Sequence, residues 1–500
     1  MLPALCALGV TAQENIEYSA EALFNASSGE LAPYFIGSLN HGVITRKNSA
    51  LLDLQALVAL NTARRFSWGA GIEVIAGYSA STRYERWNES TKSWGHNSNR
   101  PAPVWIQQLY VEGKYRAVQA YIGQRNHKSV LLDEHLSSGD LVRSSNARGI
   151  PGAGAGFIEF QNIPFTNGWL QINGVVEYGY YTDDRYTRQQ FNYYNFMLAQ
   201  DVWYTYKYCH FRTNPSKPFS VTFGMQHSGD FGGRTDNYTK GVFRSSTDRG
   251  FSLKSALKMF FPRRGTGSEY YEGNSLGSWD FKARYRLRNG DELSFAFEWP
   301  WEDGSGIGRQ NGWDGLWGLY YKSSRRQIVN GAAFEYIDFT NQSGPIHWAA
   351  ADRPGTTINN SATGGDSYYN NYAYPGFDNY GMSIGSPFLV SPLYNLNGVP
   401  VYMHDCARGF HAAVSGCIGP DVDYLVKYSW QQGWGMGRQP NAFCKLDHSM
   451  LFDVDYRADK ILPGLALKAQ VAFDAGRLRG NNFGAMIGVK YSGLFNFKKK

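Results

Sequence analysis

The stretch "WLQINGVVEYGYY", residues 169–181, alternates apolar and polar side chains along its length. The apolar side chains share one parity and the polar ones share the other: Leu170, Ile172, Val176, Tyr178 and Tyr180 against Gln171, Asn173 and Glu177. A period of two predicts a β-strand with one apolar and one polar face. The apolar face must meet either a protein core, as in a soluble sandwich, or lipid, as in a membrane barrel with a watery lumen.

The same alternation recurs in stretches such as "DVDYLVKYSWQ" (421–431), "GSWDFKARYRL" (277–287), "LALKAQVAFD" (465–474) and "HSMLFDVDY" (448–456). Each stretch is about ten residues long, which is the length that a tilted strand needs to cross a bilayer. We therefore expect many strands of membrane-spanning length.

The lengths of the connections favour lipid as the solvent of the apolar faces. Strands are predicted at 32–42, 50–60, 68–78, 104–113, 117–124, 152–162, 168–181, 199–211, 218–228, 277–287, 291–299, 314–322, 327–338, 407–418, 421–431, 447–456, 464–475 and 484–494. Short turns between them alternate with long segments, the largest being 229–276 and 339–406. This pattern is typical of an outer-membrane barrel with tight periplasmic turns and long extracellular loops. We predict an all-β transmembrane antiparallel barrel of about 18 strands, with both termini periplasmic; sixteen strands is the alternative count.

Composition agrees with a barrel. The mean hydropathy is −0.42, and no run beyond the N-terminus approaches the roughly 20 apolar residues of a spanning helix. Aromatic residues make up 16% of the chain and charged residues only 18%, with 56 Gly, which suits strands, turns and aromatic girdles. The alternative fold is a secreted β-sandwich or propeller.

The N-terminus predicts export. Residues 1–13, "MLPALCALGVTAQ", resemble the apolar core and cleavage site of a signal peptide, although the positively charged start is missing. Residues 14–31 are predicted to form a short periplasmic segment, followed by the barrel at 32–500.

Cysteine spacing and charge exclude several classes of site. No zinc-type Cys/His spacing is present, so we expect neither a metal nor another cofactor. Cys406 and Cys444 both fall at the outer ends of predicted strands and could form a disulfide. The net charge of +7 comes from scattered residues and a terminal "KKK", which gives no indication of nucleic-acid binding.

Several motifs carry a family resemblance. They include "LSSGDLVRSSNARGIP" (136–151), "DSYYNNYAYPGF" (366–377) and "GNNFGAMIGVKYSG" (480–493). From about residue 17 onward the chain resembles the capsule assembly Wzi family, and most closely the Wzi-like proteins of Bacteroidetes. The resemblance implies an 18-stranded outer-membrane barrel that attaches or organises capsular polysaccharide through lectin-like outer loops. Enterobacterial members carry an N-terminal periplasmic helical bundle, whereas here only "IEYSAEALFNAS" (16–27) could be helical, which puts any role of that bundle in doubt.

The outer loops supply candidate sugar-binding residues. Flat aromatic faces pack against sugar C–H groups, and amides and charged groups pair with hydroxyls. The candidates are Trp301, Trp313, Trp348, Tyr368, Tyr369, Tyr372, Trp434 and Arg438. The competing interpretation is that these aromatics pack the loops onto one another or belong to an interfacial girdle. Arg143 and Arg148, in segment 125–151, could bind acidic sugars or phosphates, but a role in holding the loop is favoured.

Charged side chains of both signs are predicted to face the lumen. The main ones are Lys282, Arg284, Arg286, Glu298, Lys427 and Asp453. They could line a channel, or they could form a paired network with inward-folded loops that blocks it. We rank a diffusion porin or a scaffold subunit of an outer-membrane complex below a polysaccharide-binding barrel.

A hydrolase is the third hypothesis. His227 and Ser228 are neighbours on a strand and point to opposite sides, so they are poorly placed as base and nucleophile. We therefore expect no enzymatic activity. The expected partners are surface polysaccharide, outer-membrane lipid and lipopolysaccharide, and other outer-membrane proteins or lipoproteins.

Overall fold

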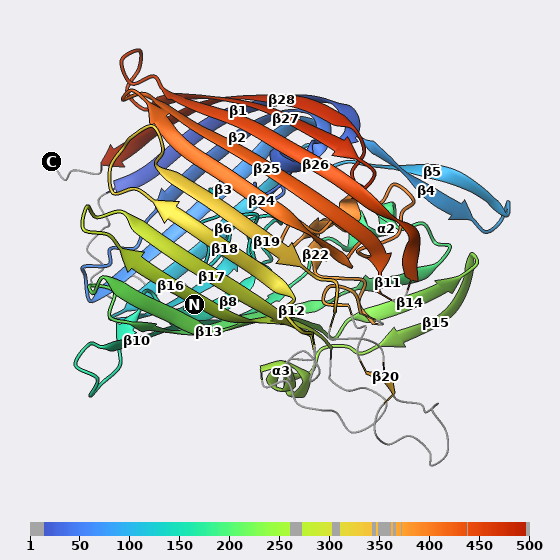
Figure 1. The fold of residues 1–500 in the computed structure, drawn as a ribbon. Helices are drawn as coiled ribbons and strands as arrows, with labels where there is room; N and C mark the ends of the chain where they lie inside the picture. The colour runs from blue at the N-terminus through green and yellow to red at the C-terminus, as the bar shows by residue number, and fades with distance from the viewer. Residues whose placement is uncertain are drawn as a thin grey trace, which may run out of the picture.

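The computed structural model describes residues 15–260, 273–302, 311–342, 347–348, 362–363, 367–371, 373–437 and 439–496. In these residues the chain forms a closed antiparallel barrel of 18 strands (Figure 1). Its helices are short, and none in the described ranges has the length and apolarity to span a membrane.

The barrel strands follow one another in chain order, and their connections alternate between short and long except that the β25–β26 and β27–β28 connections at the long-loop rim are also short. They are β1 (Asn15–Leu31), β2 (Arg46–Val58), β3 (Phe66–Ser79), β6 (Val104–Tyr115), β7 (Val118–Gln124), β8 (Gly152–Phe157) continued by β9 (Gln161–Asn162), β10 (Leu170–Tyr180), β12 (Trp203–Thr213), β13 (Phe219–Phe231), β16 (Asn274–Arg286), β17 (Glu292–Trp301), β18 (Gly315–Lys322), β19 (Gly331–Asp338), β24 (Ala407–Ile418), β25 (Val422–Met436), β26 (Gln439–Arg457), β27 (Leu465–Gly476) and β28 (Asn482–Asn496). The predicted fold class and the predicted count of eighteen are confirmed.

The long connections contain the remaining elements. They are α1 (Tyr34–Gly37), the hairpin β4 (Thr82–Asn88) and β5 (Ser93–Asn99), α2 (Asp184–Gln190), the three-stranded sheet of β11 (Phe196–Gln200), β14 (Arg234–Thr239) and β15 (Val242–Asp248), α3 (Leu253–Phe260), β20 (His347–Trp348), β21 (Ala362–Thr363), β22 (Asp378–Asn379), β23 (Met382–Ser383) and η2 (Pro392–Tyr394). We call the end of the barrel that carries these connections the long-loop rim, and the opposite end the short-turn rim.

The first and last strands close the barrel. β1 pairs with β28 from Asn15 opposite Asn496 to Ser27 opposite Gly484, and it pairs with β2 along its other edge. The described ends of the chain therefore lie side by side at the short-turn rim (Figure 1).

The predicted periplasmic segment 14–31 is wrong, because Asn15–Leu31 forms β1 within the wall. The predicted first strand at 32–42 is also wrong, since these residues contain α1 and turn inward. Residues 16–27, "IEYSAEALFNAS", were not predicted as a strand because Ala and Glu are good helix formers. Their side chains nevertheless alternate between the two faces of β1. Phe24 is 54% exposed on the outer face, whereas Leu23 and Asn25 beside it are buried. The predicted leader, residues 1–13, lies outside the described residues.

The strands are apolar outside and polar inside. In β26, Phe452 and Val454 are 43% and 41% exposed, whereas Asp453 between them is 6% exposed. In β10, Glu177 points inward and pairs with Arg143 of an inward-folded segment. The apolar parity of the 169–181 stretch therefore faces away from the lumen, as in a membrane barrel.

Candidate functional site

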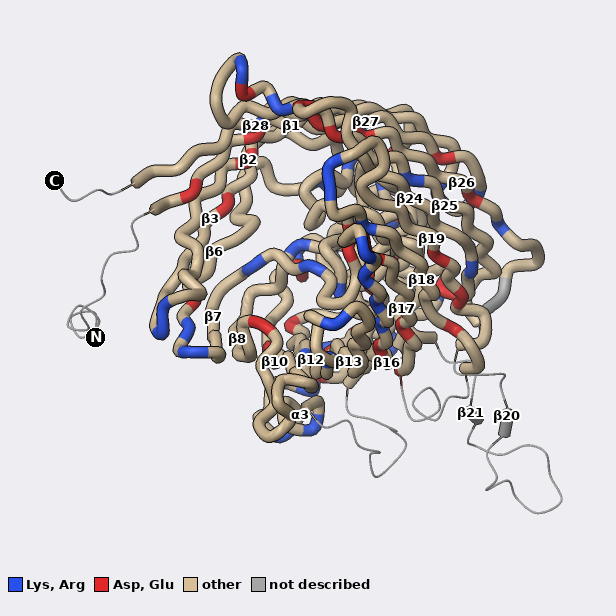
Figure 2. The backbone as a smooth tube through the Cα atoms, turned by 60° about the vertical axis from the view of Figure 1, so that its left-hand side comes forward, with Lys and Arg blue, Asp and Glu red and all other residues tan. Residues whose placement is uncertain are grey.

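Three segments fold from the long-loop rim into the lumen: residues 32–45, 125–151 and 373–406, which we call the inward-folded segments. Figure 2 shows backbone inside the ring of strands, with Lys and Arg both on it and on the wall. The segments form apolar clusters with the inner wall, in which Leu141, Phe377 and Phe388 are almost fully buried. They occupy lumen space between the walls and contact several strands.

The predicted lumen charges hold segment 125–151 in place. Lys282 Nζ donates a hydrogen bond to the Leu131 carbonyl at 2.7 Å, and Lys427 Nζ donates to the Ser137 carbonyl at 3.3 Å. The Glu298 carboxylate accepts the Leu141 amide at 2.8 Å. Three of the six predicted lumen charges thus bind the backbone of the inward-folded loop.

The other three lumen charges pair along the wall. Asp453 lies 3.1 Å from Lys468, and the guanidinium groups of Arg284 and Arg286 lie 3.0 and 3.1 Å from the Glu292 carboxylate. The structure therefore contains the paired network with inward-folded loops, one of the two alternatives drawn from the sequence.

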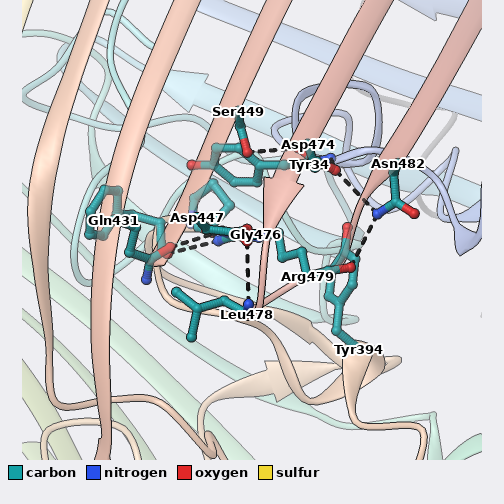
Figure 3. Close-up of polar contacts among 12 residues, drawn as sticks. Tyr34, Tyr394, Gln431, Asp447, Ser449, Asp474, Gly476, Leu478, Arg479 and Asn482 are labelled. Atoms are coloured by element: carbon teal, nitrogen blue, oxygen red, sulfur yellow. Dashed lines mark hydrogen bonds and ion pairs between the residues drawn. The ribbon is translucent and has the colours of Figure 1, made fainter. Parts of the chain in front are cut away.

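Arg479, in the turn between β27 and β28, connects the inward-folded segments with the barrel wall (Figure 3). Its guanidinium donates to Gln431 Oε1 at 2.8 Å and to the Phe388 carbonyl at 2.9 Å, and it stacks 4.2 Å from the ring centre of Tyr34. The backbone amide of Tyr34 in turn donates to the Asp474 carboxylate at 2.9 Å. One buried cation thus connects β25 with segments 32–45 and 373–406.

Arg143 and Arg148 have the structural role that was favoured. Arg143 is buried, forms an ion pair with Glu177, and lies 4.2 Å from the ring centre of Tyr206. Arg148 lies 4.2 Å from the ring centre of Tyr380 and 5.0 Å from that of Trp105. Neither guanidinium is presented at the surface as an anion site.

Several predicted sugar-binding aromatics are instead packing residues. Trp301 is 2% exposed and stacks on His227 with ring centroids 5.4 Å apart. Tyr368 and Tyr369 are buried, and their hydroxyls donate to the Asp314 carboxylate and the Leu141 carbonyl. The prediction that these three residues contact sugar is wrong. Trp301 is covered at the end of β17, and the long loop that carries Tyr368 and Tyr369 folds inward.

The remaining predicted contacts lie elsewhere. Trp313 is 68% exposed but stacks on Trp299 at 5.6 Å, on the outward face of β17, as a girdle residue would. Trp434 lies under the guanidinium of Arg408, 5.1 Å from its ring centre. Tyr372, Arg438 and the side chain of Trp348 lie outside the described residues.

The predicted disulfide is wrong, because Cys406 and Cys444 are both free. The Cys406 amide donates to the Gly435 carbonyl on one edge of β25. Cys444 precedes Lys445, which pairs with Gly433 on the other edge. β25 therefore lies between the two thiols, and two strand spacings of about 4.8 Å exceed the reach of a disulfide.

An aromatic surface that was not predicted from the sequence lies on the β4–β5 and β14–β15 hairpins and on the segment 191–195 between α2 and β11. The rings of Trp87, Trp94 and Tyr194 contact one another with centroids 4.7 to 5.5 Å apart. Tyr193 and Tyr238 make an edge-to-face contact nearby, with centroids 5.4 Å apart. We call these five residues the outer aromatic surface. Its sequence signal is "RWNESTKSWGHN" (86–97), which combines Trp and Asn as the predicted sugar-binding loops do.

A hollow of about 530 Å³ adjoins this surface. Aromatic, amide and hydroxyl groups line it together: Asn192, Tyr194, Asn195, Phe196, Tyr238, Thr239 and Asn397, with Val399 and Met403. Such a lining offers apolar faces together with hydrogen-bond donors and acceptors.

Backbone hydrogen bonds fix the relative positions of the two hairpins. The Trp87 amide donates to the Asn192 carbonyl, and the Gly241 amide donates to the Tyr194 carbonyl, both at 2.8 Å. Gly241 has a φ of +78°, and a Cβ there would lie 2.0 Å from Trp87 Nε1. Glycine is therefore required where the β14–β15 hairpin touches the indole ring.

Comparison with known proteins gives structural relatives only. No protein-family model and no curated protein matches the chain. The barrel is similar to Wzi of Escherichia coli, described as an outer membrane protein involved in group 1 capsule assembly and a carbohydrate-binding β-barrel. The TM-score is 0.53 at 12% identity, over 96% of this chain and 85% of the other.

Outer-membrane barrels of other bacteria align over similar lengths. OccAB2 of Acinetobacter baumannii has a TM-score of 0.49 at 9% identity, over 97% of this chain and 98% of that one. OprD of Pseudomonas aeruginosa has a TM-score of 0.44 at 8% identity, over 97% and 94%. The likeness to Wzi, the one of these three with a TM-score above 0.5, shows the barrel fold alone.

Proposed function

We propose that this chain is a non-catalytic outer-membrane protein that binds or organises capsular or other surface polysaccharide through its outer loops. The outer aromatic surface supports this role most directly, because its rings converge on two hairpins at the long-loop rim beside an amide-lined hollow. Aromatic faces stack on sugar C–H groups, and the amides of Asn195 and Asn397 can pair with hydroxyls. We also infer kinship with the Wzi family, and specifically with its Bacteroidetes members.

The orientation follows from the same proposal. The long-loop rim faces the cell exterior, and the short-turn rim and both termini face the periplasm. The apolar outward face, including Phe24, Phe452 and Leu319, contacts membrane lipid and lipopolysaccharide. Other outer-membrane proteins or lipoproteins are further partners in this proposal.

A non-catalytic role also fits the histidine chemistry on the barrel wall. His227 Nε2 lies 3.1 Å from Ser275 Oγ, and Nδ1 lies 2.9 Å from Lys207 Nζ, which also donates to the Met259 carbonyl at 2.7 Å. His227 thus contacts Lys207 and Ser275, whereas Ser228, its neighbour in sequence, points to the opposite face of the strand. Ser228 bonds instead to the Tyr204 hydroxyl at 2.8 Å.

The second candidate, a diffusion porin or transport barrel, is less well supported. Segment 125–151 crosses the lumen and is bound to wall residues on several strands, among them Glu177, Lys282, Glu298 and Lys427. Ion conductance across planar bilayers distinguishes the two functions, because a porin conducts steadily as purified.

The test is binding of purified protein in detergent to the host's own capsular polysaccharide. Trp94→Ala and Trp87→Ala remove stacking faces, and each should weaken binding about fivefold to tenfold. Trp313→Ala is the matched control, since Trp313 is also an exposed tryptophan near the long-loop rim but stacks on the outward wall. Unchanged binding by both surface variants, with the barrel folded, would reject this site.

A further inference from the structure

The hollow beside the outer aromatic surface has a lining without formal charge. Nine described residues line it, and none of them is Lys, Arg, Asp or Glu. The charged groups around it lie outside the lining: Arg234 pairs with Asp236 at 3.4 Å, the guanidinium of Arg86 lies 4.7 Å from a ring centre of the outer aromatic surface, and Lys240 is exposed at a hairpin tip. A ligand seated in this hollow therefore needs no charge of its own.

Two exposed asparagines of the lining turn their side-chain oxygens toward the protein. Oδ1 of Asn195 accepts the Lys240 amide at 2.9 Å, and Oδ1 of Asn397 accepts the Val399 amide at 3.2 Å. Because a backbone N–H can only donate, these contacts fix which end of each side chain is the oxygen. Within the described residues, the Nδ2 groups of both asparagines make no hydrogen bond, so they are available as donors to a ligand.

Backbone carbonyls along the hollow are occupied as well. The Asn192 carbonyl accepts the Trp87 amide, and the Tyr194 carbonyl accepts the Gly241 amide, both at 2.8 Å. The Asn397 carbonyl accepts Nδ2 of Asn192 at 2.9 Å. These residues therefore offer the ligand more donors than acceptors.

A sugar hydroxyl and an acetamido group differ in what they require from such a lining. A hydroxyl donates as well as accepts, so it also needs an acceptor for its own proton, and the asparagine oxygens are already used. The carbonyl oxygen of an acetamido group only accepts, which suits the two Nδ2 groups. Its methyl group is apolar and can pack against Phe196, Val399 and Met403, which line the same hollow.

From this combination of available amide donors and apolar side chains we infer that the hollow binds the acetamido group of an uncharged N-acetylated sugar. The inference rests on the proposed function, because it names the class of sugar that the outer aromatic surface receives. The acetamido group enters the hollow between Asn195 and Asn397, while the sugar ring stacks on the neighbouring aromatic faces. The volume of about 530 Å³ lies in the usual range for sites that hold small ligands.

The experiment titrates the purified full chain in detergent with two trisaccharides and follows binding by saturation-transfer NMR. Triacetylchitotriose and cellotriose have the same linkage and differ only in an acetamido group that replaces one hydroxyl on each ring. We expect triacetylchitotriose to bind about tenfold more tightly, with the strongest saturation at its acetamido methyl protons. Its binding should not weaken with added salt, because no charged group takes part.

Replacing the asparagines by aspartate tests the two amide donors directly. Asn195→Asp and Asn397→Asp each keep an oxygen for the backbone amide but replace the Nδ2 donor by a second acceptor. Each variant should bind triacetylchitotriose about tenfold more weakly. Asn214→Asp is the matched control, because Oδ1 of Asn214 also accepts a backbone amide, that of Ser216 at 2.9 Å, but in a short turn at the opposite end of the barrel.

Two results would overturn this inference. One is triacetylchitotriose binding that is absent or no tighter than cellotriose binding in the wild-type chain. The other is full retention of triacetylchitotriose binding by both asparagine variants. If either occurs while capsular polysaccharide still binds and Trp94→Ala still weakens that binding, only the class of sugar is wrong and the proposed function stands. If neither capsular polysaccharide nor triacetylchitotriose binds, both proposals fail.

Discussion

Removal of Arg143 should release segment 125–151 from the wall. The guanidinium of Arg143 is 4% exposed and pairs with Glu177, which is 8% exposed, beneath the ring of Tyr206. Arg143→Ala leaves the Glu177 carboxylate buried without its cation, a loss of about 3–5 kcal/mol for a buried pair. Opening the segment lets water reach Glu177, so the free energy of local opening should fall by most of this amount.

Hydrogen–deuterium exchange of residues 138–145 measures that opening. The amides of Ser138 and Leu141 donate to the carboxylates of Glu335 and Glu298, at 2.9 and 2.8 Å, and they are protected only while the segment is docked. If the free energy of local opening falls by about 3–5 kcal/mol, these amides should exchange faster by roughly two to three and a half powers of ten.

A double variant makes the reasoning refutable. Arg143→Met combined with Glu177→Leu removes both charges and keeps the volume, so protection should return most of the way to wild type. Lys460→Ala, which breaks the exposed pair between Lys460 and Asp421, should leave exchange unchanged. Two results would refute the unpaired Glu177 carboxylate as the cause. One is unchanged exchange in Arg143→Ala, and the other is exchange in the double variant as fast as in Arg143→Ala.

Three further outcomes follow from the same structure. Replacing residues 127–147 by a short Gly/Ser turn should convert the barrel into a steady ion channel in planar bilayers, where the wild type conducts little; equal conductance would mean that this segment does not block the lumen. Burial raises the pKa of Asp183 to about 6, above the ordinary 3.8, so the folded form binds this proton more strongly and protection of the outer segment around α2 should rise as pH falls from about 7 to about 4. Exchange corrected for its intrinsic pH dependence measures this rise, and constant or falling protection would contradict it. Gly241→Ala should displace Trp87 and weaken capsule binding while the thermal melting of the barrel is preserved, since the left-handed φ and the 2.0 Å approach belong only to the outer hairpins. Tryptophan fluorescence reports the displacement, and wild-type binding and fluorescence together would contradict it.

Local alternation was enough to predict the barrel, because each strand repeats its own two-sided pattern. The segments around Ile172, Phe452 and Trp279 were all recognised in this way. β1 was missed because its small and acidic residues also suit a helix, and only pairing with β2 and β28 decides its conformation.

The candidate site could be predicted less well, because loop aromatics look alike in sequence whether they pack or bind. Tyr369 is buried by packing against Phe339 and Tyr402, and its hydroxyl donates to the Leu141 carbonyl, 228 residues away. Trp87 becomes part of a surface only because Tyr194 is brought beside it. These are tertiary contacts between distant segments, and no local period encodes them.

The pairing of β1 with β28 has a consequence for how the molecule is assembled. Asn15 and Asn496 are partners, so the ring cannot close until almost the whole chain has been synthesised. Contacts between such distant residues make folding slow. A chain cut short before β28 would keep two open strand edges, and each unpaired backbone group costs several kcal/mol in lipid. Barrel closure therefore distinguishes chains that contain β28 from chains that lack it, because only the former can pair both edges of the wall.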